Sequence, residues 1–237
     1  MGFLSVLWDD FSSGFYQNFI YKDRWKYLTG GLKNSVIITL LALVLGMALG
    51  FMIALVRVTH DNTGKLRFPN RLAKLYLSVI RGTPALIQLM IIYYVVFATV
   101  NISKTAVAAI SFGINSGAYA AEIFRGGIMS VDKGQGEAGR SLGLSYSLTM
   151  RTIIMPQAMK NSLPALGNEL ITLLKETSIA GYIAISDLTK GADIIRSQTY
   201  SAFMPLLAVA LIYLCLVLLL EFILGKLEQR LRRGDSR

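Results

Sequence analysis

Three stretches of this chain run for more than 20 residues without a charged side chain: residues 34–56, 82–103 and 197–220. An α-helix rises about 1.5 Å per residue, so it needs roughly 20 apolar residues to cross a hydrocarbon core about 30 Å thick. Because 54% of all residues are hydrophobic and only 16% are charged, the runs indicate a membrane protein rather than a soluble domain.

Two less regular segments complete the predicted membrane domain. Residues 105–121 are uncharged and reach span length with Glu122, whereas Lys160, Glu169 and Lys175 interrupt residues 156–179. The sequence therefore predicts an all-α protein with five transmembrane helices, at 34–56, 70–100, 103–127, 156–179 and 202–228. This domain (34–231) should contain a cytoplasmic loop (132–155), and it is flanked by an extracellular or interfacial segment (1–33) and a cytoplasmic tail (232–237).

The basic residues give the orientation. The chain carries 24 Lys and Arg and a net charge of +10. If the five spans alternate, 16 of the 24 fall on one side of the membrane and 8 on the other. The side with more basic residues faces the cytoplasm, so we expect the N-terminus outside, the C-terminus inside, and loop 132–155 in the cytoplasm.

Sites for catalysis are not expected in this chain. Its single cysteine, Cys215, lies within the last span, and its single histidine, His60, lies in a basic loop. The sequence has no glycine-rich nucleotide loop and no metal-ligand spacing. We therefore expect no enzyme activity, no metal and no cofactor, and any energy for transport would come from another subunit.

Polar and small residues mark the interior of the bundle. Gly82-Thr83-Pro84 should kink the second span, because proline removes a backbone hydrogen bond and clashes with the preceding turn. The kink is either a packing feature or the lining of a pathway with Thr83 and Gln88.

The third span is rich in Ala, Gly and Ser, which favours a central position against other helices. Residues 180–203 should form an outer connector or docking surface, broken at Gly191.

Glu169 is the charged residue that most needs an explanation. It lies about 20 Å along the helix from Pro156, past the middle of the membrane, where a carboxylate costs at least about 2.5 kcal/mol. It needs a cation, a wet cavity or protonation. For Glu122, near the cytoplasmic end, a local ion pair with Arg125 is the simpler interpretation. The predicted substrate-binding set is Glu169, Asn168, Thr172, Thr83, Gln88 and Asn115.

The polar loop between spans three and four should contain two short helices. We expect one helix over residues 137–142, a turn at Gly143, a second helix over residues 146–155, and Pro156 at the start of the fourth span. By periodicity alone this is either a helix pair on the membrane surface or an element that docks into a groove on another protein.

Here the residues carry a resemblance. Glu137-Ala138-Gly139, followed by Gly143, Ile154 and Pro156, resembles the EAA loop of ABC importer permeases, with Gly139 in place of alanine and Met155 in place of leucine. Other stretches are similar to the polar amino-acid permeases of that superfamily: residues 81–84 with Gln88, Tyr119 with Glu122, Arg125 and Gly126, and residues 174–178.

The resemblance implies a type I importer in a prokaryotic cell membrane. Such an importer has two permease subunits, identical or homologous, two cytoplasmic ATPase subunits and an extracellular solute-binding protein, and it carries a polar amino acid. The EAA loop would couple the permease to the ATPase. The coupling residues implied are Glu137, Ala138, Gly139, Gly143, Leu144 and Pro156. The resemblance does not specify the amino acid.

Two other functions fit the composition. An ion-coupled secondary transporter would use Glu169 as its proton or sodium site, although the chain shows no second half with repeat symmetry. A membrane scaffold that transports nothing would not need Glu169. Dependence of transport on ATP hydrolysis rather than on ion gradients separates the importer from the secondary transporter.

Overall fold

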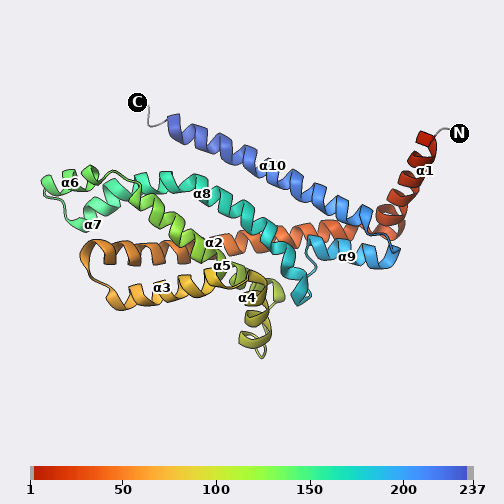
Figure 1. The fold of residues 1–237 in the computed structure, drawn as a ribbon, viewed down its shortest axis with the longest axis horizontal. Helices are drawn as coiled ribbons and strands as arrows, with labels where there is room; N and C mark the ends of the chain where they lie inside the picture. Colours follow the sequence, from red (N-terminus) through yellow and green to blue (C-terminus); the bar gives the residue numbers. More distant parts are fainter. Residues whose placement is uncertain (1–2, 234–237) are drawn as a thin grey trace.

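A computed structural model describes residues 3–233, and every element within that range is helical. The main helices are α1 (Phe3–Phe15), α2 (Trp25–Thr63), α3 (Arg67–Gly82), α4 (Ala85–Ile91), α5 (Lys104–Met129), α6 (Lys133–Ser141), α7 (Tyr146–Thr149), α8 (Met155–Glu176), α9 (Leu188–Thr199) and α10 (Phe203–Arg233). Short 3₁₀ or π segments are η1 (Tyr16–Ile20), η2 (Tyr21–Asp23), η3 (Ile92–Val96), η4 (Met150–Ile154) and η5 (Thr177–Ile183). The molecule is elongated, with α1 and α9 at one end and α6 and α7 at the other (Figure 1).

Three helices in the described residues are long and apolar enough to cross a membrane: α2, α5 and α10. A fourth candidate is the pair formed by α3 and residues 85–96, which is bent by 109°. Helix α8 has 22 residues, enough length to cross, but Lys160, Glu169 and Lys175 make it too polar to qualify. The structure thus supports an all-helical membrane protein with three to four candidate spans.

Helix α2 is much longer than the uncharged run that predicted it. It begins at Trp25 and ends at Thr63, so residues 25–33, expected in the interfacial segment, continue the first long helix. Gly64 stops it in the left-handed conformation (φ 68°), with its N–H bonded to the His60 carbonyl at 2.8 Å. At 39 residues and about 1.5 Å per residue, α2 is roughly 58 Å long and extends well beyond a hydrocarbon core.

Helix α5 is the centre of the bundle, as its small residues predicted. Of its most apolar stretch, 72% is buried, against 6% for α10. The backbones of α2 and α5 lie so close that a Cβ at Gly50 would lie 2.7 Å from the Ala120 Cβ. Close approach of this kind is how helices associate in lipid, and it fixes α5 as the scaffold for the interior polar residues.

The segment that contains α9 differs from the sequence expectation at Gly191. This glycine does not break the segment but lies within α9. A Cβ there would lie 2.5 Å from the Tyr27 carbonyl oxygen, so the glycine allows α9 to pack directly on α2. Asp187 caps α9 by accepting a hydrogen bond from the Lys190 N–H at 2.6 Å, and burial raises the pKa of its carboxyl.

The expected boundary at Pro156 also differs. Helices α7 and α8 are joined without a break through the π turn η4, and Pro156 lies in the first turn of α8. A proline has no N–H and clashes with the carbonyl four residues before it. The wider π turn, closed by the Met155 N–H on the Met150 carbonyl, relieves both problems. The second loop helix and the fourth predicted span are therefore one continuous element.

Candidate transport pathway and coupling loop

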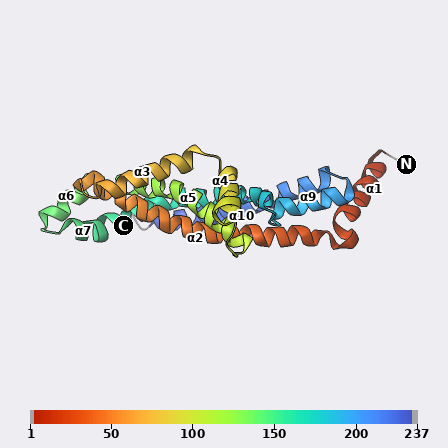
Figure 2. The same ribbon diagram turned by 90° about the horizontal axis from the view of Figure 1, so that it is seen from below.

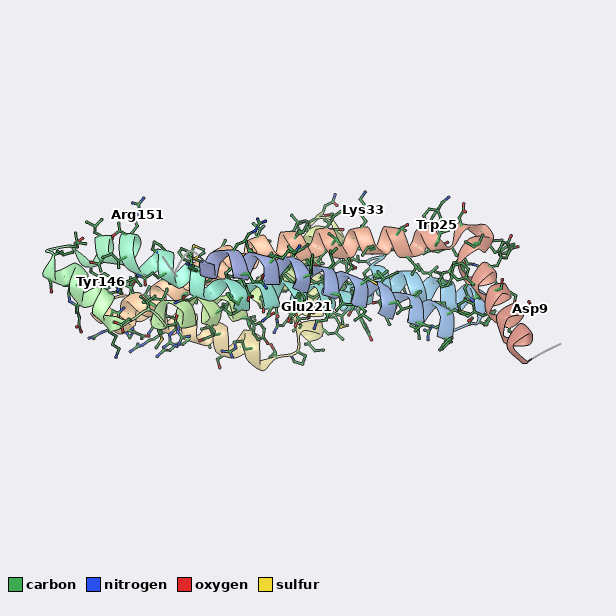
Figure 3. All side chains as sticks on the ribbon, turned by 90° about the horizontal axis from the view of Figure 1, so that it is seen from above. Asp9, Trp25, Lys33, Tyr146, Arg151 and Glu221 are labelled. Atoms are coloured by element: carbon green, nitrogen blue, oxygen red, sulfur yellow. The ribbon has the colours of Figure 1, made fainter. Side chains whose placement is uncertain are left out.

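The loop between α5 and α8 projects from one end of the molecule. Tyr146 and Arg151 lie at that end, opposite Asp9 and Trp25 (Figure 3). Asp132 caps α6 by accepting from the Gly134 N–H at 2.7 Å, and Ser145 caps α7 by accepting from the Leu148 N–H at 3.3 Å. Each short helix therefore begins next to a capping side chain that accepts a hydrogen bond from one of its free N–H groups.

Gly143 forms the turn between these helices, as predicted. Its φ is +76°, in the left-handed region that favours glycine, and no atom lies within 4 Å of where a Cβ would stand. The N–H of Gly143 bonds to the Arg140 carbonyl at 2.9 Å, and that of Leu144 bonds to the Gly139 carbonyl at 3.1 Å. A side chain here would cost backbone strain rather than a clash.

Gly139 has a different physical role. A Cβ at this position would lie 2.6 Å from the Thr149 Cγ2 and 2.8 Å from its Oγ1. An alanine here would therefore require the Thr149 side chain to move. This contact is consistent with the departure from alanine in the Glu-Ala-Gly motif. Thr149 itself is buried, and its hydroxyl has no hydrogen-bond partner in the structure.

A cavity of about 420 Å³ lies behind α6 and α7. Its walls include Val58 and Asp61 from α2, Ile128 from α5, and Glu137 and Arg140 from α6. The cavity therefore separates most of α6 from the ends of the long helices. Helix α6 contacts the rest of the chain mainly through η4 and α7, which lead directly into α8.

The predicted kink is a full break in the second span. Thr83 is extended (φ −124°, ψ 148°) and Pro84 begins α4. The Gln88 Nε2 donates to the carbonyls of Ile80 (2.7 Å) and Thr83 (3.0 Å) and to the Thr83 Oγ1 (2.7 Å). Gln88 thus satisfies backbone groups that the break leaves free, as a membrane interior requires. This arrangement gives the kink a structural role in addition to any contact with a pathway.

Asn115 on α5 joins this cluster. Its Nδ2 donates to the Gln88 Oε1 at 2.9 Å, which brings together three of the predicted site residues: Thr83, Gln88 and Asn115. Asn115 is 3% exposed, and its Oδ1 is buried without a hydrogen-bond partner. A buried amide oxygen of this kind is an acceptor that lacks a donor.

Glu169 on α8 contacts α5 at Ser116, the residue that follows Asn115. The Ser116 Oγ donates to the Glu169 Oε1 at 2.7 Å. Among residues 3–233 no lysine or arginine forms an ion pair with Glu169, so the bundle itself does not supply the cation. The adjacent residues Asn115 and Ser116 therefore connect the α4 cluster to the carboxylate on α8. Asn168 and Thr172 lie on exposed positions of α8 and are not part of these bonds.

Glu122 lies in a network between helices that includes the local pair with Arg125 that the sequence suggested. It pairs most closely with Arg57 of α2, and its oxygens also lie 3.7 Å from the Arg81 Nη1 and 3.9 Å from the Arg125 Nη1. Arg125 pairs in addition with Asp61 at 3.4 Å. This network joins α2, α3 and α5 at the end of the bundle nearer the loop helices.

Sequence reasoning missed Ser116 and Arg57. Ser116 was counted only as one small residue among many, although its place next to Asn115 on a central helix was a usable signal. Arg57 was counted only as a loop cation, because the apolar run ends at Val56. The continuation of α2 as a helix through residue 63 is what turns Arg57 toward Glu122.

Comparisons with known proteins place this arrangement in context. Residues 46–233 match the family described as "Binding-protein-dependent transport system inner membrane component". The chain is 43% identical to the putative glutamine transport system permease protein GlnP of Rickettsia bellii, over 84% of this chain and 88% of that protein. It is 36% identical to the arginine transport system permease protein ArtQ of Bacillus subtilis, over 88% and 94%.

Solved structures show the same arrangement of helices. The crystal structure of an amino acid ABC transporter with histidines superposes with a TM-score of 0.80 at 40% identity, covering 90% of this chain and 98% of that chain. The inward-facing MetNI methionine ABC transporter gives a TM-score of 0.71 at 21% identity, over 86% and 95%. At that identity the second likeness concerns the fold alone.

Proposed function

The chain belongs to the family of binding-protein-dependent transport system inner membrane components, specifically the polar amino-acid branch of ABC importer permeases, and from this premise we propose how its residues carry out transport. It is the permease component of an ABC amino-acid uptake system, a multi-pass protein of the bacterial inner membrane, and the ATPase is a separate subunit. The proposal concerns its topology, its coupling loop and its substrate contacts.

The membrane topology is five spans with the N-terminus outside and the C-terminus in the cytoplasm. The spans are α2, the bent pair of α3 and α4, α5, α8 and α10. Helix α8 counts as a span although it is polar, because it has the length to cross and because its charged residues face the interior or the ends. The 16-to-8 division of basic residues supports this orientation, which puts α6 and α7 in the cytoplasm.

Helices α6 and α7 form the element that a cytoplasmic ATPase subunit moves. The predicted coupling residues Glu137, Ala138, Gly139, Gly143 and Leu144 lie in or just after α6, at the far end of the molecule (Figure 1). The continuous helix from α7 through η4 to α8 supports direct transmission: a push on α7 moves the helix that carries Glu169. Pro156 lies within this connection rather than at its end.

The substrate contacts centre on Glu169 and Asn115. An α-ammonium group has donors and no acceptor, and two oxygens in this part of the bundle can still accept: the Glu169 carboxylate, which has one donor in Ser116, and the buried Asn115 Oδ1, which has none among the described residues. Glu169 lies on α8, and Asn115 lies next to Ser116 on α5. The observation that carries this proposal is the Glu169 carboxylate, held by Ser116 with no cation from the described part of the chain. Thr83, Gln88, Asn168 and Thr172 complete the proposed site at its margins.

The partners are those of a binding-protein-dependent system. An ATPase and an extracellular binding protein follow from the family, and we propose a second permease subunit across a two-fold axis. Relatives are named for glutamine and arginine, so the substrate proposed here is a polar amino acid of that range. Family membership removes the reason to treat Glu169 as the coupling site of an ion-driven transporter.

Reconstitution tests this function. The permease is purified with its ATPase and binding protein, placed in proteoliposomes, and supplied with labelled glutamine, arginine or cystine. We expect uptake that requires ATP hydrolysis and continues when ionophores collapse the proton and sodium gradients. Uptake that follows an ion gradient and ignores ATP would contradict the proposal.

A further inference from the structure

Helix α3 has three faces of different chemistry. One face is buried against α2 and α5 through Asn70, Ala73 and Leu77. A second, on nearly the opposite side of the helix, carries the exposed apolar residues Phe68 (70% exposed), Leu72, Leu75 (61% exposed) and Val79. The third carries the exposed cations Arg67, Arg71 and Lys74. The spacing of three and four residues within each set places its members on one side of a helix.

The cations of α3 have no counter-charge in the described part of the chain. Within residues 3–233 no carboxylate forms an ion pair with Arg67, Arg71 or Lys74. Arg81, at the end of the same helix, is instead engaged with Glu122 and lies over the Tyr119 ring. Three adjacent, exposed cations without an ion pair among the described residues, beside an apolar stripe, fit an anionic partner that also has an apolar part.

The position of α3 identifies that partner. The helix runs alongside the part of α2 that leads toward α6 and α7 (Figure 2), the end that the proposed orientation puts at the cytoplasmic leaflet. That leaflet holds anionic phospholipids, whose phosphates attract basic residues near the membrane surface. A second copy of this chain is a poorer occupant, because two-fold symmetry would bring the same unpaired cations toward each other.

We propose that α3 is a binding surface for anionic phospholipid. The phosphate of the headgroup contacts Arg67, Arg71 and Lys74, and the acyl chains lie along Phe68, Leu72, Leu75 and Val79. The leaflet assignment rests on the proposed orientation, whereas the binding itself follows from the three faces of the helix. Because α3 ends at the Thr83-Pro84 break, a bound lipid holds the helix that positions Gln88 and Arg81.

Electron paramagnetic resonance of spin-labelled lipids tests the charged face. The permease–ATPase complex is purified, and its preference for labelled phosphatidylglycerol over phosphatidylcholine is measured. A variant with Arg67→Gln, Arg71→Gln and Lys74→Gln should lose this preference at least fivefold, the factor for about 1 kcal/mol, which is the contribution of a single basic residue near the membrane surface. Arg67→Lys with Arg71→Lys keeps the charges and should keep the preference.

The matched control removes three cations at other sites, Lys22, Lys33 and Lys104, by substitution with glutamine. The preference should then be unchanged. A preference that survives loss of the α3 charges, or that falls equally in the control, overturns the proposal. The readout is lipid binding, so a failure here is distinct from a failure of ATP-driven uptake.

The apolar face has its own test. Leu75→Trp in the complex should be quenched by phosphatidylglycerol with brominated acyl chains. Leu75→Cys in a Cys215→Ala background should not form a disulfide with a second permease. Absence of quenching together with a cross-link would assign the face to a contact between permeases and would overturn the lipid assignment.

Discussion

At the scale of single residues, Glu169 is a half-buried carboxylate within a proposed membrane span. It accepts one hydrogen bond, from Ser116 at 2.7 Å, and a neutral donor offsets only part of the cost of a carboxylate in the bilayer. The sequence predicted that Glu169 lies within the membrane and that its charge needs a compensating partner. It did not predict the hydrogen bond from Ser116. A serine among small residues gives the same sequence pattern whether it only packs against another helix or also donates a hydrogen bond.

Glu169→Gln isolates the charge while keeping the shape of the side chain. A charge-assisted hydrogen bond to a substrate ammonium is worth about 1.5–3 kcal/mol, so uptake should fall roughly 10- to 150-fold with an unchanged melting temperature of the complex. The same substitution at the exposed Glu221 of α10 is the control and should leave uptake intact. Unchanged uptake in Glu169→Gln would remove the residue from the substrate site.

Gln88 has a different role, which can be separated from substrate binding. Its amide donates to the Ile80 and Thr83 carbonyls, so Gln88→Leu leaves two acceptors beside the helix break unpaired. We expect a loss of about 1–3 kcal/mol in stability and a lower melting temperature. Gln157→Leu is the matched control, because Gln157 is exposed and bonds only to the Ile153 carbonyl of its own helix. Equal melting of the two variants would argue against a structural role for Gln88.

At the scale of elements, the crossing of α6 and α7 depends on Gly139. Gly139→Ala places a methyl 2.6 Å from the Thr149 Cγ2, so it should force the helices apart, at a cost of about 1–3 kcal/mol. Thr149→Ala removes a buried hydroxyl without a partner and should itself be mild.

The double variant tests the contact directly. Gly139→Ala combined with Thr149→Ala should recover ATPase association relative to Gly139→Ala alone, which a double-mutant cycle measures as a coupling energy. Additive effects of the two substitutions would show that the crossing does not depend on this contact.

The sequence predicted the position of an element correctly where a single physical property determined that position. The uncharged runs placed α2 and α10, the small residues placed α5 at the centre, and Thr83-Pro84 placed the break. The expectations were wrong at Pro156 and Gly191, where tertiary packing decides. A π turn absorbs the proline, and the close approach of α9 to Tyr27 requires the glycine. Neither the turn nor the approach leaves a local signal in the sequence.

At the scale of the whole molecule, orientation is the first property to test. Ser12→Cys and Ser236→Cys, each in a Cys215→Ala background, mark the two ends, although Ser236 lies outside the described residues. In right-side-out vesicles an impermeant thiol reagent should label only the cysteine introduced at Ser12. Labelling of the C-terminal cysteine instead would reverse the topology and place α6 and α7 outside the cell.

The proposed transmission of movement from an ATPase subunit depends on a rigid path from α6 and α7 to the proposed substrate contacts. The described helices provide this path, because α7, η4 and α8 are continuous and α8 reaches α5 at Ser116. The turn at Gly143 sets the angle at which the loop would meet an ATPase subunit. Its φ of +76° suits glycine, is tolerated by asparagine, and is strongly unfavourable for a β-branched residue.

The most direct measurement is therefore amino-acid uptake per ATP hydrolysed, in proteoliposomes containing Gly143→Val or Gly143→Asn. Backbone strain of about 1–2 kcal/mol at the turn should lower coupled uptake about tenfold in Gly143→Val, whether the ATPase dissociates or hydrolyses ATP without transport. Gly143→Asn should retain most of the coupled uptake. Equal coupling in the two variants and the wild type would contradict the assignment of α6 and α7 as the element through which ATP hydrolysis drives this permease.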